Sequence, residues 1–182
     1  MDHRAKPWKV ISTKHILKHG RITVDEDTVQ LPNGKQTTYV YTPSLVDSVI
    51  IVAINRSGEI LIQREYSHPP HEIMWQLPGG SMLPGESIID AAQRELSEES
   101  GYAAHQSESI GYFYTNNRNS NKKQYVVVCR DLYEHRLQED DDEFIESYWI
   151  PPEKIHAMIK NKEFNNINLL AAMNLWFHVA PA

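Results

Sequence analysis

Three glutamates, Glu95, Glu98 and Glu99, lie close together in a stretch that the sequence predicts to be a helix. At ~100° per residue, their side chains fall within one arc of about 100°. Like charges at these spacings destabilise a helix by roughly 0.2–0.5 kcal/mol per pair. Clustered carboxylates suit a hard divalent cation that prefers oxygen ligands, such as Mg²⁺ or Mn²⁺. The helix by itself leaves two hypotheses open, a metal site and a solvated acidic face.

The predicted helix runs from about Ser87 to Ser100 and ends at Gly101, because glycine readily takes the left-handed conformation that terminates a helix. Arg94 can pair with Glu98 one turn later, but one guanidinium does not neutralise three carboxylates. The residues expected to face a core share an apolar arc of the helix: Ile88, Ile89, Ala92 and Leu96.

The wider spacing of charged residues and glycines is more specific than the helix alone. Gly80 is followed after five residues by Glu86 and after seven more by Arg94-Glu95-Leu96; Glu98-Glu99 and Gly101-Tyr102 then follow, each after one residue. This pattern resembles the box of the Nudix hydrolases, with Tyr102 as its one departure. The resemblance implies an α/β/α sandwich with a mixed sheet, and a hydrolase that cleaves a nucleoside diphosphate linked to another group.

The same resemblance assigns roles to residues of the box. It implies that two to three Mg²⁺ or Mn²⁺ ions bind to the Gly79 carbonyl and to Glu95, Glu98 and Glu99, with Glu98 and Glu99 counted as catalytic. Glu86 and Arg94 would orient this cluster through salt bridges. Gly80 and Gly101 complete the pattern as the glycines that flank the helix and its preceding loop.

An acidic run, residues 139–143, precedes a predicted strand. Such a run is usually a solvated loop. In ADP-ribose-cleaving relatives, the corresponding loop supplies a further glutamate. On that resemblance, Glu143 is the expected outlying metal ligand and Asp141 the expected general base, with the register open by a residue or two.

Residues 47–182 are expected to form the hydrolase domain. Val46 to Ile54 predicts a central strand buried on both faces, because its apolar run is nearly continuous. Residues 67–72 predict a rigid loop whose His68 and His71 are loop polars. The other predicted strands are 59–66, 109–115, 124–132 and 144–150, and two helices are predicted from 151 and over 165–179.

Residues 1–46 predict a small β unit with strands near Trp8, over 21–31 and over 37–42. Pro32-Asn33-Gly34-Lys35 predicts a hairpin turn in which Asn-Gly supplies the positive φ angles. So small a unit cannot bury much apolar surface alone. Its layout resembles the ADP-ribose pyrophosphatase branch, which implies a homodimer that exchanges these strands. The alternative is a hairpin that covers one side of the fold.

Composition limits the class of protein. The 182 residues carry a formal net charge of −6 and no basic stripe, which argues against nucleic-acid binding. Cys129 is the only cysteine, so an intrachain disulfide is excluded. The longest apolar run is far shorter than a membrane span, and the N-terminus lacks a signal-peptide pattern. We therefore expect a cytoplasmic protein without membrane association.

The substrate is the least determined part of the prediction. The resemblance favours ADP-ribose or another nucleotide sugar, with Arg64, Tyr66 and Arg118 as candidate substrate-binding residues. Two positions depart from the branch: Ser67 replaces an arginine, and Asn116-Asn117 stand where a proline is usual. Dinucleoside polyphosphates or damaged nucleoside triphosphates are alternative substrates. A non-catalytic nucleotide-binding module is an alternative of another class.

Overall fold

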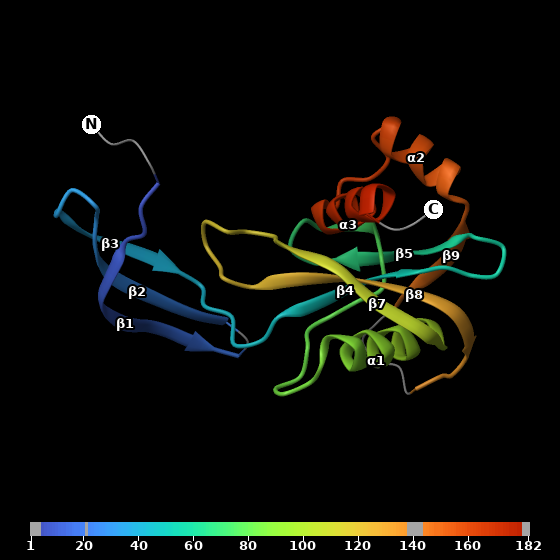
Figure 1. Cartoon of the computed structure of the whole chain (residues 1–182), viewed down its shortest axis with the longest axis horizontal. Coiled ribbons are helices and arrows are strands. Elements are labelled where there is room, and N and C mark those ends of the chain that lie inside the picture. The colour runs from blue at the N-terminus through green and yellow to red at the C-terminus, as the bar shows by residue number, and fades with distance from the viewer. Residues whose placement is uncertain (1–4, 21, 138–143, 180–182) are drawn as a thin grey trace. The chain divides into compact units, whose positions relative to one another are not determined.

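The structure is a computed structural model that describes residues 5–20, 22–137 and 144–179 (Figure 1). The chain forms two compact units. The first comprises residues 1–45 with 116–122, and the second comprises residues 46–115 with 123–182.

The first unit is built on an antiparallel sheet with the strand order β1-β2-β3. The strands are β1 (Lys9–His19), β2 (Ile22–Gln30) and β3 (Gln36–Tyr41). The β2–β3 turn differs from the prediction, because only Gly34 takes a positive φ, of 84°, and Asn33 does not. The Gly34 N–H donates to the Leu31 carbonyl at 2.9 Å, which closes a turn with Pro32 at its second position. Proline fixes a negative φ there, so the left-handed residue is the last of the turn and not one of its two central residues.

The sheet of the first unit leaves much of its apolar surface exposed. Every residue of β1 is exposed. The large apolar side chains that are exposed in this unit lie on or beside its strands: Trp8, Val10, Ile11, Ile16, Leu17, Ile22 and Val40. A three-stranded sheet in this state has little core of its own.

The second unit contains a mixed sheet with the order β4-β8-β7. Its strands are β4 (Ser48–Ala53), β8 (Lys123–Glu134) and β7 (Tyr102–Tyr114). β4 is parallel to β8, and β8 is antiparallel to β7. All six residues of β4 are buried, which confirms the strand predicted from its continuous apolar run.

A second, antiparallel sheet has the order β6-β5-β9. It is made of β6 (Glu72–Gln76), β5 (Ile60–Ser67) and β9 (Glu146–Ile150). β6 was not predicted, because the prolines of the β5–β6 turn obscure the strand that follows them. A bridge between Ile54 and Ile60 links this sheet to β4.

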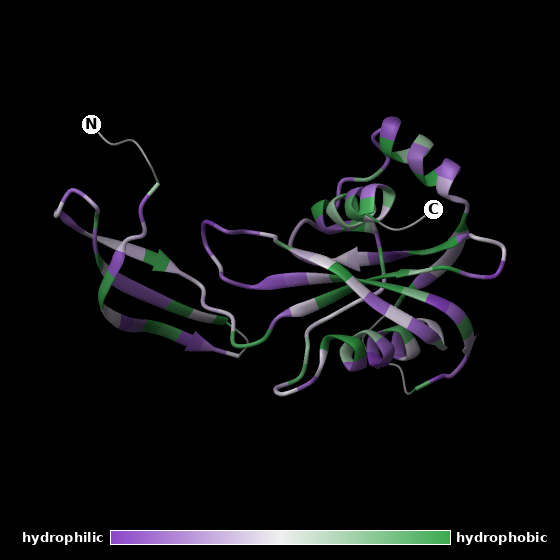
Figure 2. Cartoon of the chain, in the orientation of Figure 1, coloured by the Kyte–Doolittle hydropathy of each residue, from purple (hydrophilic) through white to green (hydrophobic). Residues whose placement is uncertain are grey.

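Helices cover both faces of this β-layer. Val49, Ile51 and Ala53 pack on the side of α1 (Ile88–Ser100). Ile50 and Val52 pack on the side of α2 (Pro152–Lys160) and α3 (Ile167–Val179). β4 is hydrophobic along most of its length (Figure 2) because it has a helix layer above and below. The predicted α/β/α sandwich with a mixed sheet is thus confirmed. Within the described ranges, no helix is long and apolar enough to cross a membrane.

Candidate active site

The first element of the site is α1, whose two ends are fixed by the residues that the sequence predicts. Ser87 caps its N-terminus, where Oγ accepts a hydrogen bond from the Asp90 N–H at 3.1 Å. Gly101 ends the helix with φ 75°, and its N–H donates to the Ser97 carbonyl. Of the residues predicted to face the core, Ala92 and Leu96 are buried against the sheet, and Ile88 and Ile89 are partly buried beside them. Ala91, which was not predicted to face the core, is buried with them. The helix is therefore held in one rotation about its axis.

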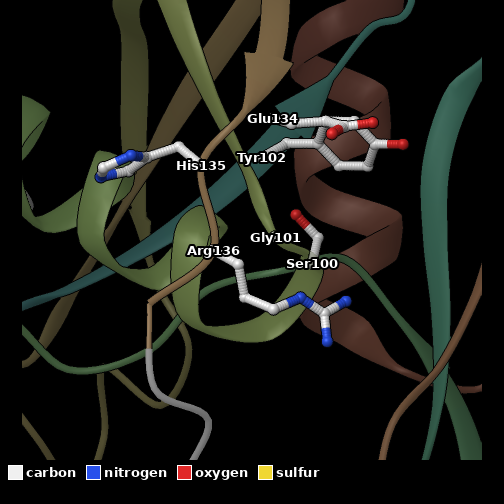
Figure 3. A pocket seen from close by; sticks show the side chains of 6 residues that line it. All are labelled: Ser100, Gly101, Tyr102, Glu134, His135 and Arg136. Carbon is white, nitrogen blue, oxygen red and sulfur yellow. The ribbon is translucent and has the colours of Figure 1, made fainter.

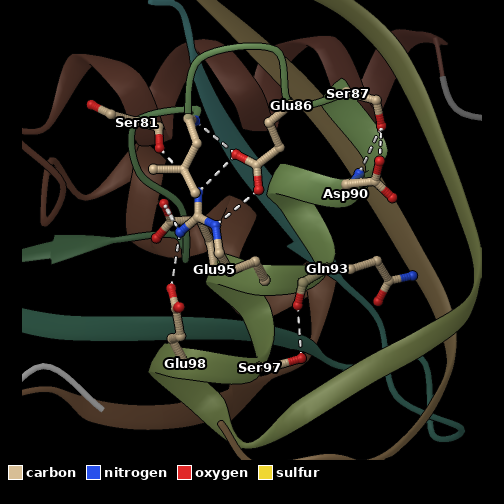
Figure 4. A network of polar contacts seen from close by, with 10 residues as sticks. Ser81, Glu86, Ser87, Asp90, Gln93, Glu95, Ser97 and Glu98 are labelled. Carbon is tan, nitrogen blue, oxygen red and sulfur yellow. Dashed lines mark hydrogen bonds and ion pairs between the residues drawn. The ribbon is translucent and has the colours of Figure 1, made fainter. Parts of the chain in front are cut away.

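Arg94 is the hub of the polar network on α1. Its Nε and Nη2 donate to the two carboxylate oxygens of Glu86 at 2.9 and 3.0 Å. Its Nη1 donates to Glu95 at 2.8 Å and to Glu98 at 2.9 Å. Nη2 also donates to the Ser81 carbonyl at 3.1 Å. Dashed lines in Figure 4 mark these contacts, and the Arg94–Glu98 pair is the one predicted from the i,i+4 spacing.

The electrostatic environment differs between the carboxylates that share this guanidinium. Hydrogen bonds from Arg94 lower the pKa of Glu86. Burial raises the pKa of Glu95, and the positive charge of Arg94 only partly opposes that effect. The three carboxylates raise the pKa of Arg94 further above its ordinary value, so it stays charged. A buried carboxylate with a raised pKa is one that a further cation would stabilise.

Two glycines bring the preceding loop close to the helix. A Cβ at Gly79 would overlap the carbonyl oxygen of Val49, and Gly79 adopts φ 146°. A Cβ at Gly80 would lie 2.5 Å from Oε1 of Glu95. Glycine is therefore required at position 79, whereas a larger residue at position 80 would displace the end of the Glu95 side chain. The Gly79 N–H donates to Oε2 of Glu99 at 3.2 Å.

The structure brings together Gly79, Glu95, Glu98 and Glu99, the four box residues predicted to bind metal. Glu95 lies against Gly80, Glu99 accepts from Gly79, and Glu98 shares Nη1 of Arg94 with Glu95. Among the described residues, no three His, Cys, Asp or Glu side chains form a ready metal site. Arg94 accounts for this in part, because its donors occupy oxygens of Glu95 and Glu98. The donor set of carboxylates and a carbonyl fits a hard divalent cation.

The predicted substrate-binding residues have different surroundings. Arg64 stacks on Trp75 at 5.3 Å from the ring centroid and lies 4.0 Å from Glu146. Tyr66 is half-exposed, and its hydroxyl hydrogen-bonds Nδ1 of His71 at 2.9 Å. Arg118 belongs to the first unit.

The C-terminal end of α1 borders a cavity of about 420 Å³. Arg136 reaches the helix end, where its Nε would be 3.0 Å from a Cβ on Gly101 (Figure 3). The His135 N–H donates to the Gly101 carbonyl at 2.8 Å. A cation at a helix C-terminus is stabilising. The cavity lining contains none of Glu95, Glu98 and Glu99. The predicted Asp141 and Glu143 lie outside the described residues.

Sequence reasoning missed two contributors to this region. The Ser81 carbonyl accepts a hydrogen bond from Arg94. Every residue has a backbone carbonyl, so the amino-acid type at position 81 does not predict this contact. Glu65 and Gln76 hydrogen-bond across β5 and β6. Both residue types are visible in the sequence, but pairing these residues required the unpredicted strand β6.

Comparison with known proteins supplies the remaining findings. A family model described as a NUDIX domain matches residues 44–173. The chain is 28% identical over 159 residues to the ADP-ribose pyrophosphatase of Bacillus subtilis (strain 168), which covers 85% of this chain and 84% of that protein. It is 26% identical over 167 residues to the ADP compounds hydrolase NudE of Escherichia coli (strain K12), covering 91% and 90%.

Two further similar proteins also match over nearly the whole chain. The methanol dehydrogenase activator of Bacillus methanolicus is 27% identical over 167 residues, covering 91% of this chain and 90% of that protein. Among solved structures, one titled as the crystal structure of ADP compounds hydrolase superposes with a TM-score of 0.87. It covers 96% of this chain and 94% of its own at 23% identity, a likeness that concerns the fold.

Proposed function

The chain belongs to the NUDIX domain family, and from that premise we propose that it hydrolyses the pyrophosphate linkage of ADP-ribose or another nucleotide sugar. The products would be AMP, or another nucleoside monophosphate, and a sugar phosphate. The observation that carries the proposal is the gathering of Glu95, Glu98 and Glu99 around the Gly79–Gly80 backbone. Partly buried carboxylates gathered in this way are costly unless a cation neutralises them.

Divalent cations would supply the neutralisation of phosphoryl charge and the activation of a water. We assign their binding to the Gly79 carbonyl and to Glu95, Glu98 and Glu99, with Mg²⁺ or Mn²⁺ as the ion and two to three ions per site. The chain's own contribution is to hold these oxygens in place before the substrate arrives.

Arg94 and Glu86 act as positioning residues in this proposal. The bidentate Glu86 contact fixes the plane of the guanidinium, and the same guanidinium holds Glu95 and Glu98. The Ser81 carbonyl ties the group to the loop. A carboxylate that is oriented by a hydrogen bond binds metal more reproducibly than a free one.

The choice of substrate rests on the relatives whose matches span nearly the whole chain and that are named for ADP-ribose or ADP compounds. Asp141 as general base and Glu143 as outlying metal ligand remain part of the proposal. Arg64 is the strongest of the three candidates for a phosphate contact, because it carries a permanent positive charge that Tyr66 lacks and belongs to the same unit as the box, whereas Arg118 belongs to the first unit. The stacking of Arg64 on Trp75 places a permanent cation on the β5–β6 hairpin.

A homodimer completes the proposal. The exposed apolar side chains of β1 would be covered by a second copy of the chain, which is the arrangement that the family branch implies. A cytoplasmic location is proposed on the same basis as in the sequence analysis.

The test is a panel of ADP-ribose, other nucleotide sugars, dinucleoside polyphosphates and nucleoside triphosphates, with Mg²⁺ or Mn²⁺ and with identification of products. AMP and ribose phosphate from ADP-ribose are expected. Inorganic pyrophosphate with a nucleoside monophosphate would identify a triphosphatase instead. Binding without metal-dependent turnover of any compound would identify a nucleotide-binding module.

A further inference from the structure

Gln63 is a fully buried amide in the middle of β5, with an exposed fraction of 0%. Among the described residues, neither its Nε2 nor its Oε1 has a hydrogen-bond partner. Buried side-chain amides in folded proteins are almost always hydrogen-bonded, because burying an unpaired donor or acceptor is destabilising. Where no protein group serves, an ordered internal water commonly does.

Gln63 faces the α1 side of the sheet. Side chains alternate along a strand, so Gln63 points to the same face as Leu61. Leu61 packs in the cluster that contains Ala92 and Leu96 of α1. The cross-strand partners of Gln63 are Gln76 on β6 and Ser147 on β9. Gln63 therefore lies in a row of polar residues that crosses β6, β5 and β9.

The chain that follows Gln76 reaches the glycine that contacts Glu99. Gln76 is the last residue of β6, and the chain continues through Pro78 to Gly79. The Pro78 carbonyl accepts from the Ile51 N–H at 2.8 Å, which fixes this segment against β4. The Gly79 N–H in turn binds Glu99 at 3.2 Å. Gln63 thus belongs to the strand pair that ends at the Glu99 contact.

We propose that Gln63 is a positioning residue that holds an internal water beneath the Gly79–Glu99 contact, and that this water orients the Glu99 carboxylate toward its cation. The inference rests on the proposed metal-binding role of Glu99. An amide offers a donor and an acceptor, so a water bound to both still has a proton to donate to a carboxylate. An apolar side chain at this position would pack equally well and do none of this.

The test replaces the amide by a side chain of similar length, Gln63→Met, and measures Mn²⁺ binding to the full chain by electron paramagnetic resonance. Loss of a group that orients a metal ligand weakens metal binding by roughly 10–100-fold, and we expect a loss in that range. The melting temperature should stay close to that of the unmodified protein, because the amide and its bound water are replaced together by an apolar side chain of similar size. If Gln63 had a purely structural role, its replacement would not lower Mn²⁺ affinity while leaving the melting temperature unchanged.

Trp176→Phe is the matched control. Trp176 Nε1 is also buried without a partner in the described part of the chain, but it packs in the cluster on the opposite side of the sheet, with α3. Its replacement should leave Mn²⁺ affinity unchanged. Glu99→Gln is the positive control and should weaken Mn²⁺ binding.

Mn²⁺ affinity of Gln63→Met within twofold of the unmodified protein, with Glu99→Gln impaired, would overturn the inference and leave the proposed function standing. Normal affinity in both variants would overturn the metal assignment as well. If Gln63→Met does not fold, a high-resolution crystal structure of the unmodified protein with Mg²⁺ decides. A water within about 2.7–3.2 Å of both Gln63 and Glu99 supports the inference, and its absence refutes it.

Discussion

β1 and β4 are both rich in branched apolar residues, but they end in opposite environments. Every residue of β4 is buried, whereas every residue of β1 is exposed. β4 lies between two helix layers, and its side chains alternate between two clusters of buried residues. β1 belongs to a three-stranded sheet, and the described residues of its unit form no helix. The second unit therefore holds its own core, while the first presents apolar surface that another surface can cover.

The two units are proposed to have different roles. The carboxylates and glycines proposed for catalysis all belong to the second unit, on a helix fixed by a buried face. The first unit carries the features proposed for association. Mutations in the two units should therefore affect different measurements.

The largest expected difference comes from the same substitution placed in each unit. Leu96→Ala in α1 removes a fully buried side chain and should lower the free energy of unfolding by about 2–5 kcal/mol. Leu17→Ala in β1 should change it by less than about 0.5 kcal/mol at protein concentrations where the chain is monomeric. Urea denaturation measures both. Equal losses would contradict the assignment of the core to the second unit alone.

Glu99→Gln tests where the chemistry lies. It should lower kcat by roughly two or more orders of magnitude, because the metal loses a charged ligand, and leave the fold intact. Steady-state hydrolysis with circular dichroism gives the answer. Glu153→Gln, an exposed glutamate in the first turn of α2, is the matched control. Near wild-type turnover in Glu99→Gln would remove its assignment.

Val10→Lys tests the association surface. If β1 is covered by a second copy, a buried lysine there should weaken the dimer at least tenfold, or about 1.4 kcal/mol. Sedimentation at several concentrations measures this. Leu45→Lys is the control, since Leu45 belongs to the same unit, is 89% exposed and lies outside its strands. An unchanged association constant for Val10→Lys would place the interface elsewhere.

The smallest expected effect is a dependence of stability on pH within the second unit. Arg94 lowers the pKa of Glu86, so the stabilisation by this pair is present near neutral pH and is lost as pH falls below 4.5 through the lowered value. Its size is about 1 kcal/mol or less. Denaturation of the unmodified chain and of Glu86→Gln should therefore differ at pH 7 and converge in acid. Burial raises the pKa of Glu95. The contribution of Glu95 to stability is therefore present in acid and is lost as pH rises. A constant difference between the two proteins would exclude the Glu86 contribution.

Local patterns carried most of the fold prediction. The ends of α1 followed from Ser87 and Gly101, and β4 followed from its unbroken apolar run. Helix ends and buried strands of this kind are determined by residues that are close in the sequence, so a short stretch is enough to predict them. The prediction that both Asn33 and Gly34 have positive φ was wrong for a local reason too. Pro32 set the turn type and left only Gly34 with a positive φ.

The sequence by itself determined which residues could form the site: a capped helix with three glutamates on one face, an arginine within reach, and two glycines before it. Only the tertiary structure decided what these residues do to one another. It joined Arg94 to Glu86 and Ser81 across the loop, set Glu95 against Gly80, and buried Gln63 under the same helix. Helical periodicity extends over one element, whereas these contacts depend on how a loop, a helix and two sheets pack, and no local pattern encodes that packing.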